Sequence, residues 1–402
     1  MLIENGDTMK KTIEDFNLDN KKVIIRVDFN VPIKDGIIID DNRIKESLKT
    51  INYAINHNAK VILLSHLGRI KNESDKAKNS LRIVAVRLSE LLKRNVVFIP
   101  ETRGTEVEKI ISNMNNKDIV LLENTRYEDL PDKKESNNDP ELATYWASLG
   151  DIFINDAFGT IHRSHASNVG IASILPSGIG FLVKNELQAL KILDEPVRPY
   201  IVILGGAKVS DKLGVINNLI KKADKIIIGG AMAFTFLKAQ GLNVGKSLVE
   251  DEYLSYCKDL IKSYSNKLIL PVDVVVSNEI SNNSISKTVL VNNISDNEIG
   301  LDLGTETINL LKKTIQDAKT VVWNGPLGYY EITTYQTSTK EILKYLTDNN
   351  INTILGGGDI VAASNELGYK DKVAHASTGG GATLEYLEGK KLPGLEIIDE
   401  NQ

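Results

Sequence analysis

Arginine, histidine and acidic side chains follow the apolar runs in the first half of the chain. Nine of the ten arginines lie at or before position 163, and four of the five histidines lie at or before position 165. The side chains that stand near the end of an apolar run are Arg26, Asp28, Asn30, His66, Arg69, Arg126, Asp156, His162 and Arg163. The fork of donors on arginine fits carboxylate and phosphate oxygens, so this set predicts a pocket for a small polyanion.

Glycine clusters take the corresponding places in the second half. They are Gly205 and Gly206, Gly229 and Gly230, Gly325 and Gly328, Gly356 to Gly358, and Gly379 to Gly381. Glycine lets backbone N–H groups approach a phosphate closely, and a helix that begins there adds a favourable dipole. One pair alone is a weak signal, because tight strand-to-helix turns also need glycine. Five sets in one half of the chain predict loops that hold nucleotide phosphates.

Charged residues accompany two of these glycine loops. Lys208 and Lys212 follow the first pair. If a helix begins just after the glycines, residues four apart share one face, and both ammonium groups point toward phosphates. Asp359 ends the sequence GGGD and offers a carboxylate to a magnesium ion, which takes one or two carboxylates plus phosphate oxygens. The alternative role of Asp359 is to cap the following helix.

Two better-known nucleotide motifs do not fit. The stretch GLNVGKS (residues 241–247) is similar to a P-loop, but it is one residue short and Gln240 stands where the first glycine belongs. We therefore expect an ordinary loop there. No G-x-G-x-x-G sequence opens a helix after a first strand, which argues against a dinucleotide-dependent dehydrogenase.

The apolar runs that position these residues are short and nearly continuous in Val, Ile and Leu. They are KVIIRVDFN, KVILLSHLGR, NVVFIPETRG, DIVLLENTRY and DIFINDAFG in the first half, and PYIVILGGAK, KIIIGGAM, KLILPVDVVV, TVVWNGPLG and NTILGGGDI in the second. Runs without alternation are typical of parallel strands buried on both faces, and segments with helical spacing separate them. Both halves are therefore expected to be doubly wound α/β structures, with ligands bound beyond the carboxyl ends of the strands.

The length of the chain favours two domains, since 402 residues exceed what one hydrophobic core usually holds. Residues 181–193 carry apolar side chains at helical spacing, and Pro196 and Pro199 end that pattern, which predicts a helical linker. We expect an N-terminal domain over residues 1–181, a linker helix over residues 182–196 and a C-terminal domain over residues 197–390.

Composition narrows the class of partner. The formal net charge is −5 and no block of five or six like charges occurs, which favours a small molecule over nucleic acid or a membrane surface. Cys257 is the only cysteine, which excludes an intramolecular disulfide and fits a reducing compartment. The N-terminus lacks an apolar signal-peptide core and no run of eighteen apolar residues occurs. We expect a cytoplasmic protein, with Met1 and Met9 as alternative starts.

Nine motifs, in order, match those of a known family. They are RVDFNVP, HLGR, LLEN-x-R, NDAFGT-x-HR, LGGAKVSDK, GGAMAFTFL, VVWNGP-x-G-x-x-E, GGGD and STGGGA-x-LE. Across essentially its whole length the chain resembles phosphoglycerate kinase. The resemblance implies an α/β fold with two Rossmann-like, doubly wound parallel-sheet domains joined by a helical hinge. It also implies a monomer whose C-terminal tail, about residues 391–402, packs on the N-terminal domain.

The same resemblance implies the reaction and the residues that carry it. The enzyme would transfer a phosphoryl group reversibly from 1,3-bisphosphoglycerate to ADP, giving 3-phosphoglycerate and ATP, with Mg²⁺ on the nucleotide. The N-terminal domain would bind phosphoglycerate through Asp28, Asn30, Arg43, His66, Leu67, Gly68, Arg69, Arg126 and Arg163. The C-terminal domain would bind the nucleotide through Gly206, Lys212, Gly230, Gly304, Asn324, Pro326, Gly328, Glu331, Gly357, Gly358, Asp359 and Ile360, with Asp359 on the metal. Arg43, Lys208 and Gly380 would act at the transferring group.

Such a reaction needs positioning and neutralised charge more than proton transfer. A carboxylate acceptor is already ionised at neutral pH, so no general base is required. His66 and His162 are accordingly expected to donate hydrogen bonds or to orient groups. Because the two substrates would bind separate domains, we expect hinge closure around the linker helix.

Two positions depart from the family pattern. Ile360 follows GGGD, where the family commonly has threonine or serine. The missing hydroxyl, worth about 0.5–1.5 kcal/mol, predicts weaker nucleotide binding. Ile70 follows HLGR in place of the usual proline, which predicts a less rigid loop around Arg69.

Two other classes of function stay open. A non-catalytic metabolite-binding or scaffold protein would keep the fold, although the complete set of charged motif residues argues against it. A different small-molecule enzyme is the second alternative. A dehydrogenase would bind a nicotinamide cofactor, and another acyl-phosphate kinase would accept acetate or carbamate.

Overall fold

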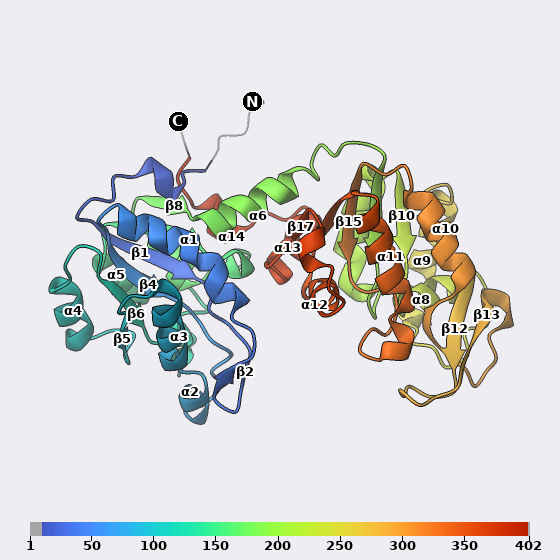
Figure 1. The fold of residues 1–402 in the computed structure, drawn as a ribbon, viewed down its shortest axis with the longest axis horizontal. Coiled ribbons are helices and arrows are strands. Elements are labelled where there is room, and N and C mark those ends of the chain that lie inside the picture. Colours follow the sequence, from blue (N-terminus) through green and yellow to red (C-terminus); the bar gives the residue numbers. More distant parts are fainter. Residues whose placement is uncertain (1–9, 401–402) are drawn as a thin grey trace. The chain divides into compact units, whose positions relative to one another are not determined.

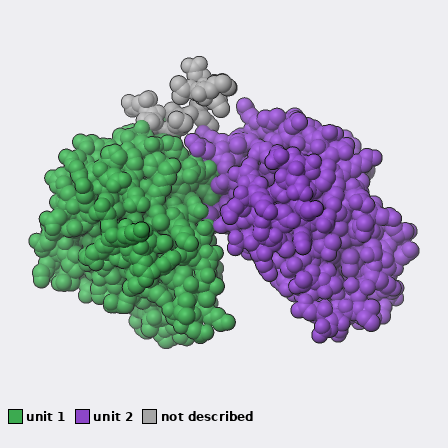
Figure 2. Space-filling view, in the orientation of Figure 1, with its two compact units in different colours: residues 1–187, 391–402 green, residues 188–390 purple. Residues whose placement is uncertain are grey.

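The computed structural model, drawn in Figure 1, describes residues 10–400, so the alternative starts Met1 and Met9 lie outside the described residues. The chain forms two compact units, which Figure 2 colours separately. Of the described residues, 10–187 and 391–400 form the first unit, and Gln188–Lys390 form the second. Each unit contains a six-stranded parallel sheet of its own. The predicted α/β class with two parallel-sheet domains is therefore confirmed.

The sheet of the first unit reverses its strand order at β1. In spatial order its strands are β5 (Val97–Ile99), β6 (Ile119–Leu122), β4 (Lys60–Leu64), β1 (Lys22–Val27), β7 (Ile152–Asp156) and β8 (Ser177–Ile179). The five apolar runs of the first half form five of these strands, whereas β8, with the sequence SGI, is too short to appear as a run. Ligands bind at such a switch point in open α/β sheets. The carboxyl ends of β4, β1 and β7 are therefore where a site is expected.

Helices cover the two faces of this sheet. They are α1 (Asn42–Asn56), α2 (Ser74–Lys78), α3 (Arg82–Leu92), α4 (Thr105–Ser112) and α5 (Pro140–Ser148), and a short hairpin of β2 (Ile33–Lys34) and β3 (Ile37–Ile38) precedes α1. The odd-numbered residues Val23, Ile25 and Val27 of β1 pack in one apolar cluster with α1 and α3. Successive side chains of a strand alternate in direction, so Arg26 points to the opposite face.

The second unit repeats this plan. Its parallel strands, in spatial order, are β11 (Leu268–Ile269), β10 (Lys225–Ile228), β9 (Tyr200–Leu204), β15 (Thr320–Asn324), β16 (Asn352–Leu355) and β17 (His375–Ala376). Its helices are α7 (Leu213–Lys222), α8 (Met232–Ala239), α9 (Leu254–Ser263), α10 (Thr305–Ile315), α11 (Thr337–Asp348), α12 (Gly358–Glu366) and α13 (Gly381–Leu387). The switch point lies at β9, between β10 and β15. Among residues 10–400, no helix is long and apolar enough to cross a membrane.

The run KLILPVDVVV does not form one strand of the parallel sheet. It divides around Pro271: β11 ends at Ile269, and β12 (Asp273–Ser277) belongs to a separate antiparallel sheet. The neighbours of β12 in that sheet are β13 (Ser286–Leu290) and β14 (Ile299–Leu303). Proline has no N–H to donate to a ladder, which separates the two strands. The sequence did not predict this second sheet, which forms one wall of the pocket described below.

Helix α6 and the C-terminal segment both link the first unit to the rest of the chain. Helix α6 (Phe181–Lys191) crosses the boundary between the units, which falls after Leu187. The C-terminal segment, with α14 (Pro393–Glu396), belongs to the first unit. There the Gly394 N–H donates to the Ile161 carbonyl at 2.8 Å.

Candidate active site

Asp28 and Arg43 form an ion pair at the switch point of the first unit. Asp28 follows β1 and Arg43 lies in the first turn of α1. Burial raises the pKa of Asp28, but the surrounding positive charge, Arg43 foremost, outweighs burial and holds that pKa below its ordinary value. Asn30 donates its N–H to Asp28 at 3.2 Å, and its side-chain oxygen accepts from the Gly68 N–H at 2.8 Å. The structure thus brings together the residues after β1, β4 and the start of α1.

His66 is held as a neutral imidazole with a defined proton position. Burial lowers its pKa well below 6.5, and Asp28, 4.0 Å from Nδ1, opposes this only in part. The Nη2 of Arg26 lies 3.2 Å from His66 Nδ1. Because a guanidinium only donates hydrogen bonds, Nδ1 must be the acceptor. The ring proton therefore lies on Nε2, which can donate to a ligand.

Three arginines gather on the loops beside His66. Arg126, in the 3-10 turn Thr125–Asp129, is mostly buried, and its pKa is lowered first by desolvation and then by the charges of Arg163 and Arg69, with Asp129 opposing. Its ion pair with Asp129 is long, at 3.6 Å, and its Nε is buried with no hydrogen-bond partner among the described residues. Arg69 and Arg163 are exposed. Crowded positive charge and an unsatisfied buried donor are the features of an anion site.

Asn124 ties these loops together, although sequence reasoning gave it no role. Its Oδ1 accepts from the N–H groups of Leu67 and Arg126, at 3.1 and 3.0 Å. Its Nδ2 donates to the carbonyls of Leu67 and Asn79, at 2.6 and 2.8 Å. The fully buried amide therefore fixes the HLGR loop relative to Arg126. The signal in the sequence was its place in the LLEN-x-R motif, two residues after the end of β6.

Two of the side chains expected in the polyanion pocket do not face it. Arg26 is fully buried and donates from Nε to Ser167 Oγ at 2.9 Å, and Ser167 in turn donates its N–H to Glu135 at 2.9 Å. Asp156 is also fully buried and accepts from the backbone of α6. The prediction was wrong for both because β1 extends to Val27 and β7 includes Asp156, so each residue still lies within its strand.

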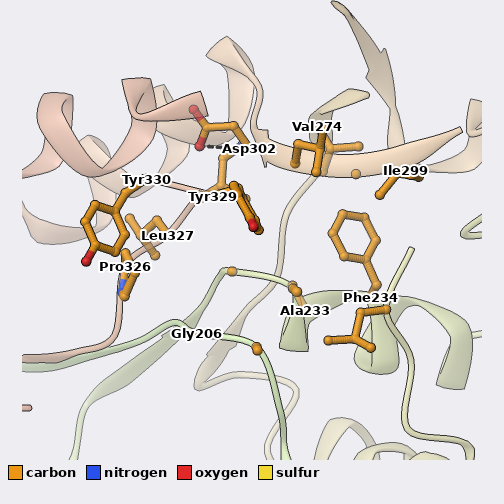
Figure 3. Close-up of a pocket in the computed structure, with 18 of the residues that line it drawn as sticks. Gly206, Ala233, Phe234, Val274, Ile299, Asp302, Pro326, Leu327, Tyr329 and Tyr330 are labelled. Carbon is orange, nitrogen blue, oxygen red and sulfur yellow. Dashed lines mark hydrogen bonds between the residues drawn. The ribbon is translucent and has the colours of Figure 1, made fainter. Parts of the chain in front are cut away.

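A pocket of about 380 Å³ lies at the switch point of the second unit. Glycine-rich loops line one side of it, after β9, β10 and β15. Apolar side chains from α8 and the antiparallel sheet line another, and Figure 3 shows Phe234, Val274 and Ile299 lying near one another there. Sequence reasoning missed these residues because an apolar residue on a strand or helix looks like any other core residue. A backbone-lined slot with apolar walls suits a flat aromatic ring.

Only part of the predicted nucleotide set lines this pocket. The lining includes Gly206, Gly230, Pro326, Gly328, Glu331 and Asp359. Lys212, Gly304, Asn324, Gly357, Gly358 and Ile360 lie outside it, as does Gly380, which was expected at the transferring group. A Cβ on Gly304 would lie 2.2 Å from the Asp273 carboxylate, so close packing alone requires this glycine. Asn324 bonds through Nδ2 to the Gly356 carbonyl and thereby joins the ends of β15 and β16.

The helix expected directly after Gly206 begins later. Residues Ser210–Lys212 form a 3-10 turn and α7 begins at Leu213, so Lys208 and Lys212 do not share an α-helical face and that prediction was wrong. Lys208 is exposed in the preceding loop. Burial lowers the pKa of Lys212, and nearby carboxylates, Asp211 and Asp359, oppose this. A Cβ on Gly206 would lie 3.8 Å from Lys212 Cε, so this side chain reaches back over the glycine loop.

Asp359 is free of the capping role considered for it. The N-cap residue of α12 is Gly357, and no side chain caps the helix. Asp359 is exposed and lines the pocket. Within residues 10–400 no group of three or more His, Cys, Asp or Glu side chains is arranged to hold a metal ion. A single carboxylate fits Mg²⁺ that takes most of its ligands from phosphate oxygens and water.

The two departures from the family pattern are both apolar packing positions. Ile360 is completely buried in the apolar cluster that contains Trp323 and Leu355. Its side chain therefore points into the apolar core. Ile70 is 6% exposed, so packing anchors the loop after Arg69 where proline is absent.

Comparison with known proteins gives a consistent result. Residues 13–390 match the family model described as phosphoglycerate kinase. The chain is 56% identical over 395 residues to phosphoglycerate kinase of Fusobacterium nucleatum subsp. nucleatum, covering 97% of this chain and 99% of that protein. It is 55% identical, with the same coverage, to phosphoglycerate kinase of Listeria monocytogenes serotype 4b.

Solved structures with this fold agree. Phosphoglycerate kinase from Coxiella burnetii superimposes with a TM-score of 0.88 at 38% identity, covering 96% of this chain and 98% of that chain. Phosphoglycerate kinase from Pyrococcus horikoshii OT3 gives a TM-score of 0.83 at 31% identity with the same coverage. The likeness thus extends over both units.

Proposed function

The chain belongs to the phosphoglycerate kinase family, and from this membership we infer which unit binds which substrate. The enzyme is a phosphotransferase with a carboxyl group as acceptor. Its glycolytic reaction is the reversible transfer of a phosphoryl group from 1,3-bisphosphoglycerate to ADP, giving 3-phosphoglycerate and ATP. We propose that the first unit binds the phosphoglycerate and the second unit the nucleotide.

The charge of the first unit supports its assignment to phosphoglycerate. The substrate carries a phosphate and a carboxylate, both of which arginine binds with two parallel hydrogen bonds. Arg126, with its unsatisfied Nε, would hold one anionic group together with Arg69 and Arg163. His66 would donate from Nε2, and Asp28 would hold Arg43 toward the reacting end.

The pocket of the second unit supports its assignment to the nucleotide. The base would lie between the glycine backbone and the apolar side, and Glu331, exposed at the pocket, would accept from the ribose hydroxyls. Lys212 and the N–H groups at the start of α12 would bind phosphate oxygens. Asp359 would supply the one protein carboxylate to Mg²⁺, which neutralises charge on those oxygens when bound.

Transfer would proceed in line and without a general base. The acceptor carboxylate is already ionised, so the side chains need only position the reactants and stabilise charge on the equatorial oxygens. We assign this stabilisation to Arg43, Lys208 and the backbone at Gly380. A neutral His66 fits a donor and not a proton shuttle.

Separate binding units require a conformational step. Because acceptor and donor would bind to different units, we propose that the units close around α6 once both ligands are present. We propose further that the enzyme acts as a monomer in the cytoplasm on small-molecule substrates alone, with neither nucleic acid nor membrane as a partner.

A coupled assay tests the function and the role of Lys208 together. The single observation that carries the proposal is the buried, unsatisfied Arg126 donor within a cluster of arginines in a member of this family. With saturating Mg-ATP and 3-phosphoglycerate, the acyl phosphate is followed through glyceraldehyde-3-phosphate dehydrogenase and NADH. We expect turnover that falls by about a hundredfold in Lys208→Ala, the typical effect of removing one group that stabilises transition-state charge.

The matched control is Lys258→Ala. Lys258 is an exposed lysine on α9, and its loss should leave turnover unchanged. A folded wild-type protein that binds both ligands without turnover would favour the scaffold alternative. Phosphorylation of acetate or carbamate in place of 3-phosphoglycerate would favour another acyl-phosphate kinase.

A further inference from the structure

Two buried side chains of the first unit hold the start of α6. Asp156, the last residue of β7, accepts through Oδ1 from the N–H groups of Leu182 and Val183, at 2.9 and 3.4 Å. Thr50 of α1 accepts through Oγ1 from the Phe181 N–H at 2.9 Å. The first N–H groups of a helix have no partner inside the helix. Asp156 and Thr50, both fully buried, therefore satisfy the donors that α6 leaves free.

Gly180 makes this close approach possible. A Cβ at that position would lie 2.2 Å from Asp156 Oδ1, so any larger residue would displace the carboxylate. The Gly180 N–H donates to the Asn155 carbonyl at 3.0 Å. The chain thus enters α6 pressed against the end of β7, and the geometry of the helix start depends on that strand.

The same strand end leads into the loop that carries Arg163. Within that loop a Cβ on Gly159 would lie 2.5 Å from Asp28 Oδ2, which shows how closely the loop packs on the acidic residue of the site. Asp156 therefore stands between two segments. One faces the phosphoglycerate site, and the other is the helix that continues past Leu187 into the second unit.

Taking the closure of the two units proposed above as given, we propose that Asp156 is a positioning residue that fixes α6 to β7. The first turn of α6 then moves as one body with the first unit, and the chain bends only beyond that turn. Loss of the anchor would leave each binding site intact but would make the closed arrangement less well defined. A displacement of about 1 Å at the reacting atoms is enough to cost about a hundredfold in rate.

The pKa of Asp156 determines the pH at which the anchor is tested. Burial raises the pKa of this carboxyl to about 6, against the hydrogen bonds from Thr50, Val183 and Leu182, and Glu46 of α1 raises the pKa further. A carboxylate is a stronger acceptor for backbone N–H groups than a neutral acid. The comparison of variants is therefore made well above that pKa, where the anchor is ionised.

The test compares kcat with KM in Asp156→Ala. We expect kcat to fall by about ten- to a hundredfold while KM for ATP and for 3-phosphoglycerate changes by less than about twofold. Asp156→Asn keeps an oxygen acceptor for Leu182 and should restore most of kcat. Hydrogen exchange of the Leu182 and Val183 amides should speed up in Asp156→Ala alone.

The matched control is Asp139→Ala, which removes the N-cap of a helix that stays inside the first unit. Asp139 Oδ1 accepts from the Leu142 N–H at 2.9 Å at the start of α5. This variant should lose stability without losing kcat. Equal losses of kcat in Asp156→Ala and Asp139→Ala, or no loss in Asp156→Ala, would overturn the positioning role.

A second variant and a scattering measurement test the same anchor independently. If Asp156→Ala does not fold, Thr50→Val removes the bond from the Phe181 N–H and the hydrogen bond to Asp156. This variant should show the same split between kcat and KM in milder form, and an unchanged kcat would count against the anchor. If wild type lacks turnover, the proposed function fails, but small-angle scattering with Mg-ATP and 3-phosphoglycerate still decides the anchor. A decrease in the radius of gyration of wild type on adding both ligands, with a smaller decrease in Asp156→Ala, supports the anchor. An equal decrease in both proteins, or no decrease in either, overturns it.

Discussion

The side chain that follows the GGGD loop stabilises the second unit by packing. Ile360 is fully buried beside Trp323 and Leu355. Replacing it by threonine removes apolar contacts and buries a hydroxyl, which together cost about 1–3 kcal/mol. We expect Ile360→Thr to lower the free energy of unfolding in urea by about that amount. KM for ATP should stay the same, because the side chain is completely buried in the apolar cluster.

Ile360→Val separates loss of volume from the added hydroxyl. This change removes one methylene and should cost about 0.5–1.5 kcal/mol, less than the threonine. A lower KM for ATP in Ile360→Thr, at unchanged stability, would contradict this packing role. It would instead support the hydroxyl–phosphate contact that the family pattern suggested.

Arg26 and Arg43 show what a residue type alone cannot reveal. Both are arginines, and the sequence placed Arg26 at the end of an apolar run and Arg43 in an ordinary helix start. In the structure Arg26 is buried and orients His66, whereas Arg43 pairs with Asp28. Strand length decides the direction of a side chain, and a one-residue difference turns it to the other face. The family resemblance, not the spacing, pointed to Arg43.

At the scale of elements, the loops after β9 and β10 meet backbone to backbone. Gly230 has a φ of +64°, and a Cβ there would lie 2.4 Å from the Gly206 carbonyl oxygen and 3.1 Å from that of Pro326. Gly230→Ala must push these pocket-lining loops apart. We expect KM for ATP to rise at least about tenfold, equivalent to a loss of about 1.4 kcal/mol of binding free energy, with little change in KM for 3-phosphoglycerate.

Gly241→Ala is the control for backbone strain. Gly241 has a φ of +86°, yet no atom lies within 4 Å of a Cβ built there. Both variants therefore carry the left-handed strain of about 1–2 kcal/mol, but only Gly230→Ala meets a steric obstacle. Similar changes of KM in the two variants would show that strain and not loop contact controls the pocket.

Strands with a continuous apolar pattern were predictable from the sequence. The strands β13 and β14 of the antiparallel sheet, which lack that pattern, were not. All ten apolar runs contribute a strand to the two parallel sheets, because burial on both faces imposes a continuous apolar pattern, and only the run KLILPVDVVV also contributes to the antiparallel sheet. The antiparallel sheet escaped prediction, since β13 is partly exposed and β12 is separated from β11 only by residues 270–272. The apolar side of the pocket in the second unit, which β12 and β14 help to line, was therefore not predicted either. The glycine loops were visible because their residue type carries the chemistry.

At the scale of the whole molecule, buried neutral histidines link stability to pH. Burial lowers the pKa of His162 to about 4 and that of His165 to about 3. In the unfolded chain a histidine takes up its proton near pH 6.5. Their contribution to stability is therefore complete above about pH 6.5 and is lost as pH falls toward the folded-state values.

The variant His165→Gln isolates this effect. We expect the loss of unfolding free energy between pH 7.5 and 5 to be smaller in His165→Gln than in wild type, measured by urea denaturation. Burial raises the pKa of Asp156 and of Asp302 to about 6, so these two carboxyl groups make the folded state more stable as pH falls, opposite to the histidines. The effect of one histidine is therefore measured by comparing a variant with wild type. His57→Gln, at an exposed position, should leave the pH dependence of wild type unchanged. The same pH dependence of the unfolding free energy in His165→Gln and His57→Gln would contradict the role given to His165.

The return of the C-terminus to the first unit has a consequence for biosynthesis. The Gly394 N–H donates to the Ile161 carbonyl beside the Arg163 loop, and the Lys11 N–H donates to the Asp399 carbonyl at 2.8 Å. Ribosomes make the residues of the second unit before these last ones, and domains generally fold as they emerge. The unit whose synthesis starts first is thus the last to be finished. Until residues 394–399 have left the ribosome, the Ile161 carbonyl lacks its partner, so the first unit is completed only after the second unit has been made.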